Sequence, residues 1–301
     1  MDPQTTVVVV TYNAARTIGP LLDALTPAHE RLGTRCVVVD NASADGTLDL
    51  VRGAYPWVTA VPSGGNVGFG RGCNLGFEST QTRYVLFLNP DAVMSLAALT
   101  TLETFMEDHP RAGACAPAIR EGDELQAAGL LATPRTVLRA AVGLRKAYPQ
   151  SRPIRPGEVP FRTPWVCGAA LMMRSDVFRS VGGFDPRFFL YFEETDLLRR
   201  TEAAGWEIWA VGQAVIDHEG AGAAKDTGQS LVGGCIAEHY FESRYYYLTK
   251  HHGRVAAAVT EAGEVAALLA RAALKRGLGR ADSRFRQRVA APLFRGPKKV
   301  S

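Results

Sequence analysis

The sequence lacks the paired cysteines that build a disulfide framework or a zinc site. Its five cysteines are odd in number and scattered, and no two of them form a C-x-x-C pair. This pattern argues against a small disulfide-stapled protein and fits a reducing compartment, so we expect a cytoplasmic protein.

Long apolar runs and targeting signals are also missing. No stretch of 18 apolar residues occurs, because the nearest one, 255–274, is interrupted by Glu261, Glu264 and Arg271. The first residues show neither a basic start nor a small-residue cleavage site. We therefore expect no membrane-spanning helix and no signal peptide.

Acidic residues are scarce only at the end of the chain. Residues 271–301 contain ten Lys and Arg against one acid, Asp282, a local charge of +9, whereas the other 270 residues carry −5. Such a tail is either a solvated extension or a surface that docks on anionic lipid. An apolar helical stripe lies close to this tail and consists of Val265, Leu268, Leu269 and Ala272. The stripe predicts either an interfacial helix or a helix packed on the catalytic domain. We expect no nucleic-acid partner, since no aromatic and basic reading surface accompanies the tail.

What the sequence does contain is an alternation of strands and helices. Apolar, β-branched runs predict strands at 6–11, 36–40, 58–61 and 84–88, with helices between them at 18–25, from Thr47 and at 73–78. This order predicts an α/β fold with a mostly parallel central sheet. Residues 111–160 are rich in Pro, Gly and Arg and predict long loops with short elements. A strand at 169–174, helices at 175–181 and 194–204, and helical sequence from about residue 234 follow.

Three of the predicted strands end in polar residues: Thr11-Tyr12-Asn13, Asp40-Asn41 and Asn89-Pro90-Asp91. In an open parallel sheet, ligands bind outside the carboxyl ends of the strands. The glycine-rich segment 68–73 is not a dinucleotide fingerprint, because Cys73 stands in place of the third glycine and the segment follows the third strand. An ordinary dinucleotide-dependent oxidoreductase is therefore disfavoured.

Seven motifs in order carry a resemblance. TYN, VVDNASADGT, GNVGFGRGCNLG and FLNPDA are followed by WVCGAALMMR, GGFDPRFFLYFEETDLLRR and GWEIW. Over about residues 5–252 the chain resembles the family 2 glycosyltransferases with the GT-A fold. It is particularly similar to the rhamnosyltransferase-type members that build bacterial polysaccharides and lipid-linked glycans.

The resemblance implies a catalytic domain over residues 1–252, with a nucleotide-binding half at about 1–110 and an acceptor and catalytic half at about 111–230. Residues 253–301 would form a helical, basic extension. The donor would be a nucleotide diphosphate sugar with dTDP or UDP, and the acceptor a glycan or a polyprenyl-linked molecule. The protein would be cytoplasmic, with peripheral contact between its basic tail and the inner face of the plasma membrane.

The resemblance also assigns site residues. The nucleotide sugar would be held by residues at the strand ends and in the glycine-rich loop: Thr11, Tyr12, Asn13, Asp40, Asn41, Asn66, Arg71, Asn89 and Gly168. Asp40 suits a nucleoside because a carboxylate accepts hydrogen bonds from a pyrimidine N3–H or a ribose hydroxyl. The glycines would allow a close backbone approach to the ligand.

A divalent cation, Mg²⁺ or Mn²⁺, would bridge Asp91 and the diphosphate. Asp91 is the one carboxylate of the family's D-x-D element, and Asn89 stands in place of its first Asp. His218 resembles the histidine that completes this metal site in several relatives. A histidine after a strand also has a plain structural interpretation.

The catalytic base would come from the segment Glu193-Glu194-Thr195-Asp196. In the family the base is the second residue of the leading acidic pair, which is Glu194 here, and Asp196 is the alternative. A carboxylate within reach of the acceptor hydroxyl removes its proton as the oxygen attacks. In-line attack then inverts the anomeric centre.

Two other functions stay open at this point. A catalytically degenerate nucleotide-sugar-binding or scaffold subunit would keep the fold without turnover. A nucleotidyltransferase would need a glycine-rich, basic loop directly after the first strand, where this chain has Thr11-Tyr12-Asn13-Ala14-Ala15.

Overall fold

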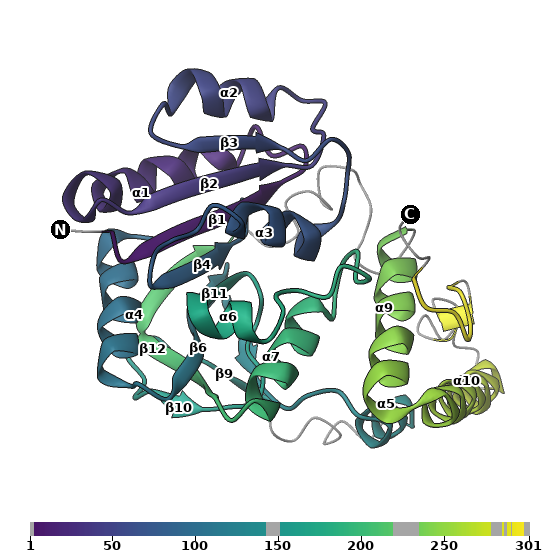
Figure 1. The fold of residues 1–301 in the computed structure, drawn as a ribbon. Helices are drawn as coiled ribbons and strands as arrows, with labels where there is room; N and C mark the ends of the chain where they lie inside the picture. The colour runs from purple at the N-terminus through teal and green to yellow at the C-terminus, as the bar shows by residue number, and fades with distance from the viewer. Residues whose placement is uncertain are drawn as a thin grey trace.

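One long sheet forms the centre of the computed structural model, which describes residues 3–142, 151–218, 235–277, 285, 288–289 and 291–297 (Figure 1). The strands of its main path lie in the order β10-β12-β6-β11-β4-β1-β2-β3. They are β10 (Phe161–Arg162), β12 (Glu207–His218), β6 (Ala112–Glu121), β11 (Ala170–Arg174), β4 (Tyr84–Leu88), β1 (Thr5–Thr11), β2 (Arg35–Asp40) and β3 (Thr59–Pro62).

Most of these strands point in one direction. The neighbours β3, β2, β1 and β4 are parallel, β6 and β12 are parallel to each other, and β11 runs antiparallel to both β4 and β6. The carboxyl ends of β1, β2, β4, β6 and β12 therefore meet at one edge of the sheet. The predicted α/β class with a mostly parallel sheet is confirmed.

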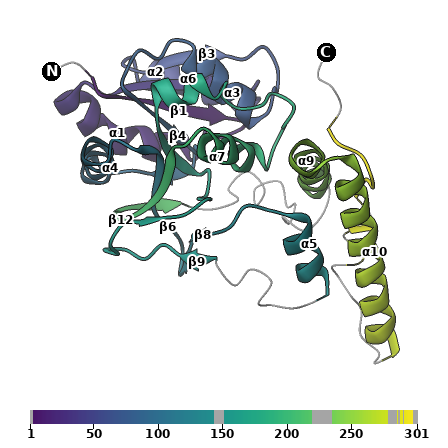
Figure 2. The same ribbon diagram turned by 60° about the horizontal axis from the view of Figure 1, so that its bottom comes forward.

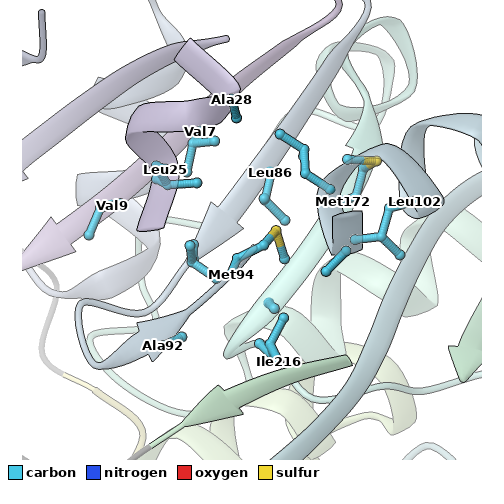
Figure 3. Close-up of a cluster of buried hydrophobic side chains, with 14 of the residues drawn as sticks. Val7, Val9, Leu25, Ala28, Leu86, Ala92, Met94, Leu102, Met172 and Ile216 are labelled. Carbon is cyan, nitrogen blue, oxygen red and sulfur yellow. The ribbon is translucent and has the colours of Figure 1, made fainter. Parts of the chain in front are cut away.

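Helices cover both faces of the sheet. The helices are α1 (Ile18–Leu32), α2 (Thr47–Ala54), α3 (Phe69–Phe77), α4 (Leu96–Asp108), α5 (Pro134–Ala141), α6 (Ser175–Ser180), α7 (Glu193–Ala203), α9 (Cys235–His252) and α10 (Arg254–Gly277). One core lies between the sheet and α1, α2 and α4, and includes Val7, Leu25, Leu86, Met94 and Ile216 (Figure 3). A second core lies on the opposite face against α3, α6 and α7, and includes Val8, Phe87, Phe178, Phe184 and Leu197. The β-branched run of β1 is buried along its whole length because it has a core on each side.

The prediction of loops across 111–160 is wrong at its start. Residues 112–121 form the ten-residue strand β6, which is paired by β11 and β12. Its sequence, AGACAPAIRE, is rich in small residues and contains Pro117, so it lacks the β-branched signal of the other strands. Burial between two neighbours, rather than intrinsic propensity, makes it a strand. The rest of this region holds short elements: β7 (Glu124–Leu125), β8 (Ala127–Ala128), β9 (Arg152–Pro153) and α5.

The helices α9 and α10 pack on the rest of the protein through a third apolar cluster. Phe188 and Phe192, from the loop before α7, lie in it with Tyr247 of α9, Ala257 of α10 and Val137 of α5. The predicted apolar stripe is divided between the two sides of α10, since Leu268 is buried on the inward face, Val265 and Ala272 are half-buried and Leu269 is exposed. Part of the basic tail lies outside the described residues. None of the described helices is apolar over a span that could cross a bilayer.

Candidate active site

The predicted nucleotide residues gather where β1 and β2 end. Both oxygens of the buried Asp40 carboxylate accept hydrogen bonds, from Thr11 Oγ1 at 2.9 Å and from the backbone N–H and the hydroxyl of Ser43 at 2.9 and 2.5 Å. Asn13, in the left-handed region at φ 52°, accepts from the Ala44 N–H at 2.8 Å. Tyr12 is exposed beside them. The carboxylate is thus fixed in place by its own strand ends.

Asn41 and the glycine-rich loop form the next part of this edge. Asn41 Nδ2 donates to the Gly68 carbonyl at 3.2 Å, and its Oδ1 is buried without a hydrogen-bond partner in the described structure. Asn66 Oδ1 accepts from the Gly68 N–H at 3.2 Å. Arg71 lies in the first turn of α3, which begins at Phe69. The structure thus brings Asn66 and Arg71 to the loop that adjoins Asp40 and Asn41.

The glycines of this loop serve packing between protein segments. Gly68 has φ 86°, and a Cβ there would stand 2.4 Å from the Phe189 carbonyl oxygen, which accepts from the Phe69 N–H at 3.0 Å. A Cβ at Gly72 or Gly76 would press into Val10 or Val8 of β1. The loop and α3 therefore lie directly on the sheet and on the 185–192 segment, a use of glycine that the sequence interpretation did not include.

A second polar cluster forms around His218, at the carboxyl end of β12. Its Nε2 lies 3.0 Å from Asp91 Oδ1 and 3.3 Å from Asn89 Nδ2. The short strand β5 (Ala92–Val93) pairs with the end of β12 and holds Asp91 against the imidazole. The structure therefore brings the two predicted metal ligands, Asp91 and His218, into contact.

Glu121 is the member of this cluster that sequence reasoning missed. Its Oε1 lies 2.7 Å from His218 Nδ1. Burial lowers the pKa of His218, but the carboxylates of Asp91 and Glu121 outweigh it and hold that pKa above its ordinary value. Glu121 ends β6, so recognition of this strand would have placed it at the same sheet edge as Asp91 and His218.

The donor set fits a divalent cation. A carboxylate oxygen and an imidazole nitrogen adjoin each other, and the second ring nitrogen is oriented by a carboxylate, as is usual for metal-bound histidine. Within the described residues, no group of three or more His, Cys, Asp and Glu side chains is arranged to hold a metal by itself. A cation here would need further oxygen ligands from a bound molecule.

Glu193 and Glu194 open α7 at the same edge, after two residues in a strained backbone conformation. Tyr191 and Phe192 both have φ 68°, which is rare for residues with a Cβ. Glu193 is buried, and burial together with the charge of Glu194 raises its pKa well above the ordinary value. Burial also raises the pKa of Glu194, partly offset by its hydrogen bonds. Glu193 is the more deeply buried of the two, and its pKa is raised the more strongly.

Trp165 and Gly168 surround the Glu194 side chain. Trp165 Nε1 lies 3.2 Å from Glu194 Oε1 and 3.0 Å from Thr195 Oγ1, and the Thr195 hydroxyl donates to the same Glu194 oxygen at 3.1 Å. A Cβ at Gly168 would stand 3.2 Å from the Cβ and Cγ of Glu194. Both donors to this carboxylate are uncharged, so it keeps its basicity.

The Glu194 and His218 clusters are joined through the start of β11. The Asn89 N–H donates to the Ala169 carbonyl at 2.9 Å, one residue from Gly168. Between the clusters, burial raises the pKa of the Cys167 thiol to about 12, and the charges of Glu194 and Glu121 act in the same direction. The predicted base and the predicted metal ligands thus share one edge of the sheet.

Asp196, the alternative base, faces away toward α9. Its fully buried carboxylate contacts Arg200 at 2.8 Å, Lys250 at 2.8 Å and His251 at 2.7 Å. Burial alone would raise its pKa, but the hydrogen bond with His251 and the charges of Arg200 and Lys250 lower it to about 2. A carboxylate held so firmly in its charged form is a weak proton acceptor.

Comparisons with known proteins bear on this arrangement. The sequence profile of the family described as "Glycosyl transferase family 2" matches residues 6–182, more than half of the chain. The chain belongs to this family. The structure of this glycosyltransferase is similar to that of the mannosyltransferase PcManGT from Pyrobaculum calidifontis in complex with GDP-Man and Mn²⁺. The TM-score is 0.57 at 20% identity, with 96% of this chain and 79% of that chain covered.

A curated relative is closer in sequence. The N-acetylglucosaminyl-diphospho-decaprenol L-rhamnosyltransferase of Mycobacterium tuberculosis is 31% identical over 268 residues, covering 82% of this chain and 84% of that protein. A crystal structure of GalNAc-T7 with UDP, GalNAc and Mn²⁺ shares the fold at a TM-score of 0.59 and 15% identity, covering 84% of this chain and 51% of that one. The predicted membership of the rhamnosyltransferase-like glycosyltransferases with the GT-A fold is confirmed.

Proposed function

We propose that this glycosyltransferase moves a sugar from a nucleotide diphosphate to a hydroxyl of a lipid-linked or cell-surface glycan. Rhamnose is the sugar we propose, and the transfer inverts the anomeric carbon. The observation that carries the proposal is the Glu194 carboxylate, which has uncharged hydrogen-bond donors and adjoins Gly168 at the carboxyl-end edge of the sheet. The rhamnose and the lipid-linked acceptor are supported by the name of the mycobacterial relative.

The donor nucleotide would lie along the ends of β1 and β2 and beside the glycine-rich loop. Thr11, Tyr12, Asn13, Asp40 and Asn41 would hold the nucleoside there, and the buried, unpartnered Oδ1 of Asn41 supports a ligand contact at this point. Asn66 and Arg71 would lie next to the diphosphate, and Asn89 and Gly168 next to the sugar. A pyrimidine nucleotide, dTDP or UDP, is the base we propose.

Asp91 and His218 would hold the divalent cation, Mg²⁺ or Mn²⁺, with Glu121 orienting the imidazole through Nδ1. When bound, the cation neutralises charge on the leaving diphosphate. Asn89 contributes an amide rather than a second carboxylate, so fewer anionic ligands are present than in a D-x-D site. The Mn²⁺ in two structural neighbours supports this assignment.

Glu194 would remove the proton from the acceptor hydroxyl as its oxygen attacks the anomeric carbon. The bond to the diphosphate oxygen breaks on the opposite side, which inverts the centre without a covalent intermediate. Burial favours this role, because a raised pKa makes Glu194 a better proton acceptor at neutral pH. Asp196 holds α7 against α9 instead. The domain division at residue 252 and the cytoplasmic, membrane-peripheral location are retained as part of the proposal.

The test is to measure hydrolysis and transfer with dTDP-rhamnose and a panel of UDP- and GDP-sugars, with Mg²⁺, with Mn²⁺ and with EDTA. We expect turnover of one donor that EDTA abolishes, and product of inverted configuration by NMR. In parallel, Glu121→Gln should weaken Mn²⁺ binding, measured by electron paramagnetic resonance with nucleotide diphosphate present, by about 10- to 100-fold. EDTA-insensitive turnover, or unchanged Mn²⁺ affinity in the variant, would contradict the metal assignment.

A degenerate binding subunit is the second candidate, because it too would keep this fold. Measurable nucleotide affinity with no turnover of any donor in the panel would establish that function in place of transfer. A nucleotidyltransferase is disfavoured, since β1 is followed by Tyr12 and Asn13 rather than by a basic, glycine-rich loop.

A further inference from the structure

Helix α10 presents a continuous apolar face to the outside of the molecule. Val255, Val259, Leu269 and Leu274 are exposed by 77%, 61%, 54% and 74%. Exposed alanines complete the same stripe: Ala262, Ala266, Ala270 and Ala273. Because these residues recur every three or four positions, they lie on one side of the helix. A hollow lined by Ala270, Ala273, Leu274 and Gly277 marks its carboxyl-terminal end.

The opposite face of α10 already packs on the protein. Ala257, Thr260 and Leu268 are buried there, against α9 and α5. Glu264 accepts from Arg244 Nη1 at 2.9 Å and from Arg288 Nε at 3.1 Å, and Glu261 pairs with Arg288. Figure 2 shows α10 at the outer side of the molecule, with α9 between it and α7. The apolar stripe is therefore not needed to fix the helix in place.

The charge on the two faces is divided by sign. Glu261 and Glu264, the acids of α10, are both buried, whereas Arg254 and Arg276 are exposed. Residues 271–301 carry a local charge of +9 in the sequence. Arg288 and Arg295 use part of that charge internally, on Glu261 and Glu242. The outer face of α10 thus combines apolar and basic residues, and none of its exposed residues between 254 and 277 is Asp or Glu.

We propose that the outer face of α10 docks on an anionic lipid bilayer, lying parallel to its surface. Apolar side chains on the outermost face with basic residues at both ends suit insertion at the level of phosphate headgroups. A second copy of the chain is a poorer fit, because Arg254 and Arg276 would meet like charges and the exposed face of α10 offers no acid to pair with them. The inference extends the proposed function, since a lipid-linked acceptor lies at a membrane.

The docking face connects to the candidate base through α9. Lys250 and His251 of α9 bind Asp196, two residues from Glu194 on α7. The helix proposed to meet the lipid, α10, is thus connected through α9 to the helix that carries the candidate base. Docking through α10 would therefore place the candidate active site near an acceptor at the bilayer surface.

The test compares Leu269→Glu/Leu274→Glu with the charge-matched control Leu50→Glu/Val159→Glu, whose exposed residues lie outside α10. Sedimentation measures how much of each full-length protein binds to phosphatidylcholine vesicles. The vesicles either lack phosphatidylglycerol or contain about 40% of it, which imitates a strongly anionic membrane surface. We expect wild type and control to bind only the anionic vesicles, and the α10 variant to bind at least about tenfold more weakly. Circular dichroism should show the same helix content in all three.

Equal binding by the α10 variant and the control would overturn the proposal, as would wild-type protein that ignores anionic vesicles. Light scattering of each protein tests whether a second copy of the chain covers the face instead. If the wild type is a dimer and the α10 variant is a monomer, the face belongs to a dimer interface. Vesicle binding does not depend on catalysis, so this test gives a clear result even if the protein turns over none of the donor sugars. Hydrolysis of the donor in solution should be unchanged in both variants, since neither touches the candidate active site.

Discussion

Two groups of carboxylates on the first turn of α7 face opposite sides and have opposite properties. Glu194 accepts hydrogen bonds from the uncharged donors Trp165 and Thr195, Glu193 is buried beside it, and burial raises the pKa of both carboxyls. Asp196, two residues on, faces α9 and contacts the charged Arg200 and Lys250 and the imidazole of His251, and its pKa falls to about 2. The helix dipole acts on all three alike. The difference therefore comes from what each carboxylate contacts, and it separates the proposed proton acceptor, Glu194, from the ion-paired Asp196.

The largest effect should come from removing the proton acceptor. Glu194→Gln should lower kcat of transfer by about 10³-fold, within the range that general bases contribute, with nucleotide affinity and thermal stability unchanged. Steady-state kinetics and calorimetric titration of the nucleotide diphosphate measure this. Glu193→Gln is the control, because it makes the same change of side chain at the neighbouring buried position, where burial raises the pKa of the carboxyl. An equal fall of kcat in both variants would contradict the assignment of Glu194, rather than Glu193, as the base.

Removing the ion-paired carboxylate should affect stability instead. Asp196→Asn leaves Arg200, Lys250 and His251 around a neutral group, and should lower the free energy of unfolding by about 2 kcal/mol at neutral pH. Urea unfolding measures the change. Glu202→Gln, at an exposed position of the same helix, should change it by less than about 0.5 kcal/mol.

The same contact predicts a pH dependence. Because the folded pKa of Asp196, about 2, lies below the ordinary value of 3.8, its contribution is present above pH 4 to 5 and is lost as pH falls toward 2. The difference in unfolding free energy between wild type and Asp196→Asn should shrink over that interval. A difference that stays constant down to pH 2 would contradict the ion pairing.

A smaller effect should follow from crowding Glu194 without changing its chemistry. Gly168→Ala puts a methyl group 3.2 Å from the Glu194 Cβ and Cγ, so the carboxylate must shift by a few tenths of an ångström. We expect kcat to fall about tenfold, since small misplacements of reacting groups are costly. Gly53→Ala, where a Cβ meets nothing within 4 Å, is the matched control. Full activity in Gly168→Ala would show that this contact does not position the base.

The smallest effect should come from one hydrogen bond. Trp165→Phe removes a donor that stabilises the charged form of Glu194, so the pKa of this base rises. The acidic limb of the kcat/KM profile should move to higher pH, with a few-fold loss at pH 6 to 7 on the order expected for one hydrogen bond. Trp209→Phe removes a similar bond, from Trp209 to Glu207 at 3.1 Å, and should leave the profile in place.

Local pattern was enough to predict the strands of the amino-terminal part of the chain. The strands at 6–11, 36–40 and 84–88 are apolar runs with cores on both sides, so β-propensity and burial agree there. The ends of those strands placed Thr11, Asp40 and Asp91 correctly at one edge. Ordered motifs placed Glu194 at the start of α7.

The remainder depends on contacts between distant segments. Glu121 was missed because β6 has weak β-propensity and is a strand only through its neighbours β11 and β12. The role of Asp196 depends on Lys250 and His251, more than fifty residues away in α9. The outward face of α10 could not be told from its inward face, since both are apolar and only packing against α5 and α9 distinguishes them.

The contact between Gly68 and Phe189 has a consequence for turnover. The Phe69 N–H is bonded to the Phe189 carbonyl, and Gly68 leaves no room between the two backbones. The loop beside the donor site and the segment that leads into the base helix thus share a joint. If the loop opens to release the spent nucleotide, the segment that sets Glu194 must move with it. Release of the nucleotide and repositioning of Glu194 would then be coupled through this one backbone contact.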